Sequence, residues 1–158
     1  MAIPGLLQEG IRSVLARSDD ALRALVTSRG LPEDAAEHVR QTLEALPGLL
    51  EAMDRALRRA PDHPEARALF LLVLSYLLQD DDLLPSRAGR PVLGLLDDVY
   101  LVHRAAQELE PHLGRVDMRS IAGGAELLRG LLPEHVVWAL DAAVEQAGTE
   151  AATLIGKG

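Results

Sequence analysis

Hydrophobic residues recur at intervals of three and four positions along almost the whole chain, the spacing of helices that each bury one face. Alternating patterns of β-branched or aromatic residues, which are typical of strands, are nearly absent. Leu, Ala, Glu and Arg, which favour helices, dominate the composition. We therefore predict an all-α fold, a compact single-domain bundle of about six to seven helices.

Turn and capping residues divide this pattern into segments. The spacing predicts a helix over residues 5–16, and Ser18 is a candidate N-cap for a second helix that ends at Gly30. Gly123 and Gly124 are expected to interrupt a helix or to mark a point of close packing, and Gly148 is expected to end the last helix. The other helices are expected over residues 31–46, 49–60, 64–79, 91–109, 118–132 and 133–147.

Residues 1–148 are predicted to form one helical domain, and residues 149–158 a flexible C-terminal tail. The most apolar run, residues 68–78, is too short for a membrane-spanning helix, which needs about 20 residues. We expect it to be a buried helix that forms a central apolar hairpin with the helix starting at Pro91.

Composition excludes several classes of function. The chain has no cysteine, so it cannot form disulfides or thiolate metal sites. Its net charge of −8 opposes binding to nucleic acid. The N-terminal residues lack the pattern of a signal peptide, and we expect a cytoplasmic protein without a cofactor.

The stretch YLLQDDDLLPSRAGRPVLGLLDD, residues 76–98, places five aspartates beside apolar residues. On the helix from Pro91, Asp98 falls at the edge of the apolar stripe, whereas Asp97 points to the opposite, solvated face. A half-buried carboxylate requires a partner, and Arg87 or Arg90 is within reach of Asp98.

Asp82 is the aspartate best placed to stabilise the turn before Pro85 by accepting backbone N–H bonds. Alternatively, the hairpin brings Asp82 and Asp98 together to bind a divalent cation such as Mg²⁺ or Ca²⁺. The sequence leaves both alternatives open.

The same stretch resembles the signature of the YkvA-like domain of unknown function, a family of small bacterial helical proteins. The resemblance covers about residues 55–105 and is carried by Tyr76, Asp82, Pro85, Pro91, Gly94, Asp97 and Asp98. It implies a small helical module, associated with membranes in some family members, for which no reaction is established.

Sequence motifs for catalysis are missing. None of the five histidines belongs to an H-E-x-x-H motif, and no serine lies in a nucleophile elbow. His103 is expected to be a satisfied histidine at the core boundary, and Trp138 to pack in the core or at an interface.

We therefore favour a non-enzymatic interaction module that binds another protein or associates with itself. Leu154 and Ile155 in the tail are candidates for docking into a groove. The alternatives are a cation-binding protein or cryptic metal-dependent enzyme that uses Asp82 and Asp98, and a peripheral membrane protein that attaches through the hairpin.

Overall fold

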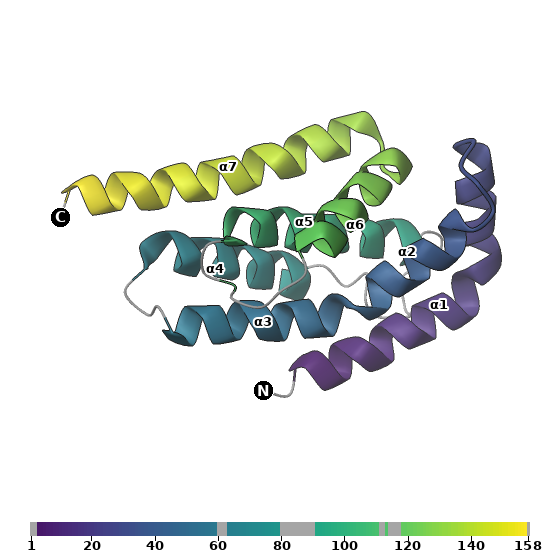
Figure 1. Ribbon diagram of the computed structural model, residues 1–158, viewed down its shortest axis with the longest axis horizontal. Coiled ribbons are helices and arrows are strands. Elements are labelled where there is room, and N and C mark those ends of the chain that lie inside the picture. Colours follow the sequence, from purple (N-terminus) through teal and green to yellow (C-terminus); the bar gives the residue numbers. More distant parts are fainter. Residues whose placement is uncertain (1–2, 60–62, 80–90, 111–112, 114–117, 158) are drawn as a thin grey trace.

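The computed structural model describes residues 3–59, 63–79, 91–110, 113 and 118–157, and for some helical residues, including 91–95 and 150–157, it describes the backbone alone. The described residues form α-helices and no strands, which confirms the predicted all-α bundle. The α-helices of the described residues are α1 (Ile3–Ser28), α2 (Ala35–Glu44), α3 (Leu46–Arg59), α4 (Pro64–Gln79), α5 (Pro91–Glu108), α6 (Met118–Leu131) and α7 (Glu134–Lys157) (Figure 1).

The first helix is longer than predicted. Residues 3–28 form one continuous helix, so Ser18 lies in its interior and is not an N-cap. The predicted end at Gly30 is confirmed, because Gly30 has φ of +70° and its N–H bonds to the Thr27 carbonyl at 3.0 Å. The Leu31 N–H bonds to the Val26 carbonyl at 3.2 Å. These two bonds form a Schellman motif, in which glycine adopts a left-handed conformation without steric cost.

The glycines of the C-terminal third do not end helices. Helix α6 continues through Gly123 and Gly124, and α7 continues past Gly148 to Lys157. The predicted interruption of α6 and the predicted stop at Gly148 are therefore wrong. Residues 149–157, expected as a flexible tail, are helical. A glycine inside a helix costs only about 1 kcal/mol relative to alanine, and neighbouring helical residues and tertiary packing outweigh that cost.

Helix α5 is the centre of the bundle. It packs against α4, as the predicted apolar hairpin requires, and also against α1, α3, α6 and α7. Helix α7 lies along one side of the bundle, where it covers α4 and α5, and its C-terminal end extends beyond them in Figure 1. Because neighbours surround α5, nearly every described side chain from Leu96 to Ala106 is buried.

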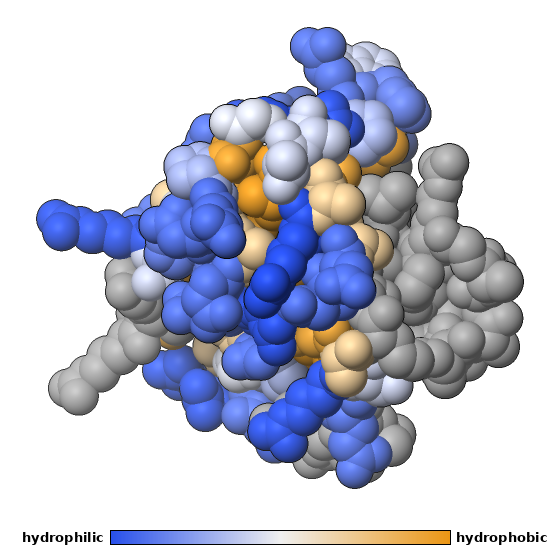
Figure 2. Space-filling view, turned by 90° about the vertical axis from the view of Figure 1, so that its right-hand side faces the viewer, coloured by the Kyte–Doolittle hydropathy of each residue, from blue (hydrophilic) through white to orange (hydrophobic). Residues whose placement is uncertain are grey.

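Polar side chains cover much of the molecular surface. Figure 2 shows the α1–α2 end of the molecule, where hydrophilic side chains of the described residues separate smaller apolar areas.

None of the helices in the described part of the chain combines the length and the apolar character needed to cross a bilayer.

Candidate functional site

The two adjacent aspartates of α5 differ in burial, as their positions on the helix predict. Asp98 has no exposed surface, whereas Asp97 is partly exposed. Asp98 is buried more deeply than the core-boundary position that the sequence predicts. The reason is that the helical pattern assumes one solvent-facing side, whereas α5 is enclosed by five helices.

The other residues of the predicted site lie where the structure does not describe them fully. Asp82, Pro85, Arg87 and Arg90 lie outside the described residues, and Tyr76, Pro91, Gly94, Leu154 and Ile155 lie on helices but without described side chains. Among the described residues, no group of three potential ligands is placed to hold a metal ion. An arginine partner for Asp98 and a cation bound by Asp82 and Asp98 therefore both stay predictions.

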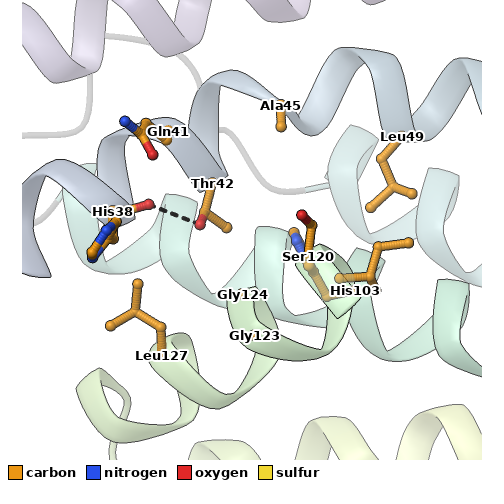
Figure 3. A pocket seen from close by; sticks show the side chains of 11 residues that line it. His38, Gln41, Thr42, Ala45, Leu49, His103, Ser120, Gly123, Gly124 and Leu127 are labelled. Atoms are coloured by element: carbon orange, nitrogen blue, oxygen red, sulfur yellow. Dashed lines mark hydrogen bonds between the residues drawn. The ribbon is translucent and has the colours of Figure 1, made fainter. Parts of the chain in front are cut away.

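A cavity of about 540 Å³ opens between α2 with the start of α3 on one side and α6 on the other (Figure 3). This volume falls within the range of small-molecule sites, which is about 300–1,000 Å³. Ala45 points from the α2–α3 junction toward α6, and Leu127 points from α6 toward α2. The described residues that line it are His38, Gln41, Thr42, Ala45, Leu49, His103, Ser120, Ile121, Gly123, Gly124 and Leu127.

His103 of α5 is the most buried polar group in this lining, with 4% of its surface exposed. Its Nδ1 lies 2.8 Å from the carbonyl oxygen of Val99, one turn earlier. Because a carbonyl can only accept a hydrogen bond, Nδ1 carries the proton of the neutral ring. The second nitrogen, Nε2, is then an acceptor, and it makes no hydrogen bond to any residue that the structure describes.

Burial lowers the pKa of His103 below its ordinary value of 6.5, because the charged imidazolium loses hydration in the interior. The hydrogen bond to the Val99 carbonyl acts in the opposite direction and is the smaller effect. His103 is therefore neutral at pH 7. His103 is therefore buried rather than at the core boundary; its Nδ1 is hydrogen-bonded, and its Nε2 is accessible from the cavity.

Gly124 allows α6 to approach His103 closely. A β-carbon at residue 124 would lie 3.0 Å from His103 Nε2 and 3.1 Å from Thr42 Cγ2, which is closer than side chains normally pack. At Gly123 a β-carbon would have no neighbour within 4 Å. The prediction of a close-packing point is thus confirmed for Gly124 and not for Gly123.

A second polar group lies where α5, α6 and α7 meet, and the sequence did not reveal it. The hydroxyl of the buried Tyr100 donates a hydrogen bond to Asp141 Oδ1 at 2.7 Å and accepts one from Arg129 Nη2 at 3.0 Å. Arg104 Nε donates to the same Asp141 oxygen at 2.9 Å. Burial raises the pKa of Tyr100, so its hydroxyl stays protonated and can donate.

These four residues connect three helices and none of them lines the cavity. Tyr100 and Arg104 lie one turn apart on α5. Two side chains with polar end groups at this spacing in an apolar helix are the one sequence signal that could have indicated the network. The partners on α6 and α7 depend on tertiary packing, which the sequence pattern does not report. The arrangement holds α7 on the bundle.

Trp138 is exposed, which contradicts its expected place in the core and leaves an interface as its remaining predicted role. Its side chain is 74% exposed on α7, while its neighbours Val137 and Leu140 are buried. Among the described residues, the other large exposed hydrophobic residue is Leu71 of α4, at 57%.

Comparisons with protein-family models, with curated proteins and with solved structures found no match. The resemblance to the YkvA-like family therefore stays a prediction that rests on the residues quoted for it.

Proposed function

We propose that the protein is a non-enzymatic helical interaction module, that its contact surface is the outer face of α7, and that its partner is a basic segment of another protein. The observation that carries this proposal is the exposure of Trp138. Tryptophan is the residue most enriched among those that dominate binding energy at protein interfaces. Because Trp138 lies in a regular helix, binding through it does not require a loop to become ordered, which would cost free energy.

The charge around Trp138 supports a basic partner. Glu134 lies one turn before it and Glu145 two turns after it, and both side chains are exposed. Residues at these spacings share one helix face. The chain as a whole carries a charge of −8, so a second copy would bring like charges to the same surface. Electrostatics therefore favour a basic partner over self-association.

A cytoplasmic location is part of this proposal and is supported by the absence of cysteine, which is compatible with a reducing compartment. The absence of a catalytic motif supports the non-enzymatic assignment. The tyrosine–arginine–aspartate network supports it too, because its polar groups hydrogen-bond to one another across helices.

Affinity capture with matched variants tests the proposed surface. The bait is the full chain as wild type, as Trp138→Ala and as Leu71→Ala, which removes the other large exposed hydrophobic side chain. We expect partners that bind wild type and Leu71→Ala to be lost with Trp138→Ala, because losing a central tryptophan typically weakens binding by about 2 kcal/mol or more. Equal recovery with all three baits would remove the α7 face as the contact surface.

Two further measurements separate the alternatives. Removal of residues 149–158 tests the predicted docking role of Leu154 and Ile155, and loss of partners in this variant alone would move the contact to the tail. Light scattering of the isolated protein tests self-association. A dimer that Trp138→Ala dissociates would replace the basic partner by a second copy of this chain.

A further inference from the structure

We infer that the cavity between α2 and α6 is a binding site for a small uncharged molecule that donates a hydrogen bond from a hydroxyl or amide group to His103 Nε2. This inference is independent of the α7 surface, because none of the residues around Trp138 lines the cavity. Three observations carry it.

The first observation is the state of His103. Only 4% of the surface of His103 is exposed. The hydrogen bond from Nδ1 to the Val99 carbonyl makes Nε2 the acceptor of the neutral ring. Nε2 is not one of the fully buried side-chain atoms that lack a hydrogen bond, so it is accessible from the cavity that His103 lines. Since Nε2 makes no hydrogen bond to a described residue, it can accept one from a molecule in the cavity.

The second observation is the charge of the lining. Among the lining residues that the structure describes there is no Asp, Glu, Lys or Arg, and their two ionisable groups are the histidines His38 and His103. His103 is neutral because it is buried. Among these described residues a carboxylate or phosphate would find no Lys or Arg, and an ammonium group no carboxylate, so a charged ligand would lose hydration without compensation. An uncharged ligand meets no such penalty.

The third observation is the division of the lining into polar and apolar parts. Leu49, Ile121 and Leu127 provide apolar surface for the body of a ligand. Gln41 at the exposed edge carries an amide that can donate or accept, and the Thr42 hydroxyl is already directed to the His38 carbonyl at 2.9 Å. An apolar pocket with a few placed polar groups is the usual form of a small-molecule site.

Gly124 is part of the same arrangement. A side chain at this position would press against the edge of the ring that carries Nε2. With glycine, that edge remains beside the backbone of α6 and on the cavity wall.

The experiment is a titration of the full-length protein, labelled with ¹⁵N, followed through the imidazole nitrogen resonances of His103. The probes are a fragment library that contains a matched series: benzyl alcohol as a neutral donor, benzyl methyl ether without a donor, and benzoate and benzylamine as charged forms. We expect Nε2 to shift with neutral donors. The ether should bind roughly three- to tenfold more weakly, since that is the net effect of one hydrogen bond, and the charged probes more weakly still.

Two alanine-to-phenylalanine variants locate the site. Ala45→Phe places an aromatic ring at a position that points into the cavity, whereas Ala122→Phe alters an exposed alanine of α6 that does not line it. We expect Ala45→Phe to abolish the shifts and Ala122→Phe to retain them. If no library member moves the His103 resonances, the site is excluded. Equal binding of the alcohol, the ether and the charged probes would exclude the assigned ligand class.

Discussion

A β-carbon at Gly124 would lie 3.0 Å from His103 Nε2, so the contact between α6 and α5 depends on the absence of a side chain at residue 124. The neighbouring Gly123 has no such contact, although both glycines lie inside the same helix. The pair therefore separates the intrinsic cost of glycine in a helix from the effect of close packing.

Gly123→Ala is expected to stabilise the protein by about 0.5–1 kcal/mol, because alanine loses less conformational entropy in a helix. Gly124→Ala has the same intrinsic gain, but the new methyl group displaces the His103 ring and Thr42. We expect its free energy of unfolding to fall below that of Gly123→Ala by about 1 kcal/mol or more. Urea denaturation of both variants measures the difference, and equal stabilisation would contradict the close contact.

The stability of the protein is expected to depend on pH through His103. The pKa of His103 is lowered in the folded state, so between that value and 6.5 the unfolded chain binds more protons than the folded one. The contribution of neutral His103 is thus fully present above pH 6.5 and is lost as the pH falls toward the folded-state pKa. Denaturation between neutral and acidic pH should show a stronger loss for wild type than for His103→Phe, which does not titrate. Parallel curves for the two proteins would contradict the burial of a neutral histidine.

The Tyr100 and Asp141 side chains are expected to be coupled in energy. Tyr100→Phe removes a hydrogen bond to a carboxylate and leaves Arg129 with one partner fewer. We expect a loss of about 1.5–3 kcal/mol in the free energy of unfolding, as for hydrogen bonds to charged groups. A double-mutant cycle with Asp141→Asn should give a coupling energy of about 0.5–3 kcal/mol. Its control is Glu126→Gln, which alters an exposed pair with Arg129 and should change stability by less than about 0.5 kcal/mol.

Truncation of Trp138 and of Leu140 is expected to change the free energy of unfolding to very different extents. Trp138 is 74% exposed and Leu140 is 4% exposed, although they are two residues apart on α7. Trp138→Ala should leave the free energy of unfolding within about 0.5 kcal/mol of wild type, whereas Leu140→Ala should lower it by about 2–5 kcal/mol. Trp138 is the one tryptophan of the chain, so its fluorescence should be that of a hydrated indole and readily quenched by acrylamide. A blue-shifted, protected emission would place it in an interface or in the core.

The helical state of residues 149–157 is tested at Gly148. A β-carbon there would lie 3.8 Å from Glu65 Oε1, an ordinary contact distance. Gly148→Ala is therefore expected to stabilise the helix by about 0.5–1 kcal/mol and to slow amide hydrogen exchange in residues 149–157. If these residues formed a flexible tail instead, the substitution would leave their exchange unchanged.

Much of this protein follows from local sequence patterns. Helical spacing and the near absence of strand patterns predicted the all-α fold, and Gly30 and Pro64 marked a helix end and a helix start correctly. These features depend on backbone conformation within a few residues, which a single sequence encodes directly. The different environments of Asp97 and Asp98 also followed from spacing alone.

Tertiary structure decided the properties that depend on which helices meet. The full burial of Asp98 results from the enclosure of α5 by five helices, and a periodic pattern on one helix does not report how many neighbours surround it. The cavity, the close approach of Gly124 to His103 and the Tyr100–Asp141 bond each join residues that are far apart in sequence. Trp138 is exposed because α7 presents Val137 and Leu140 to the bundle, and hydrophobicity alone does not indicate which of these neighbours faces inward.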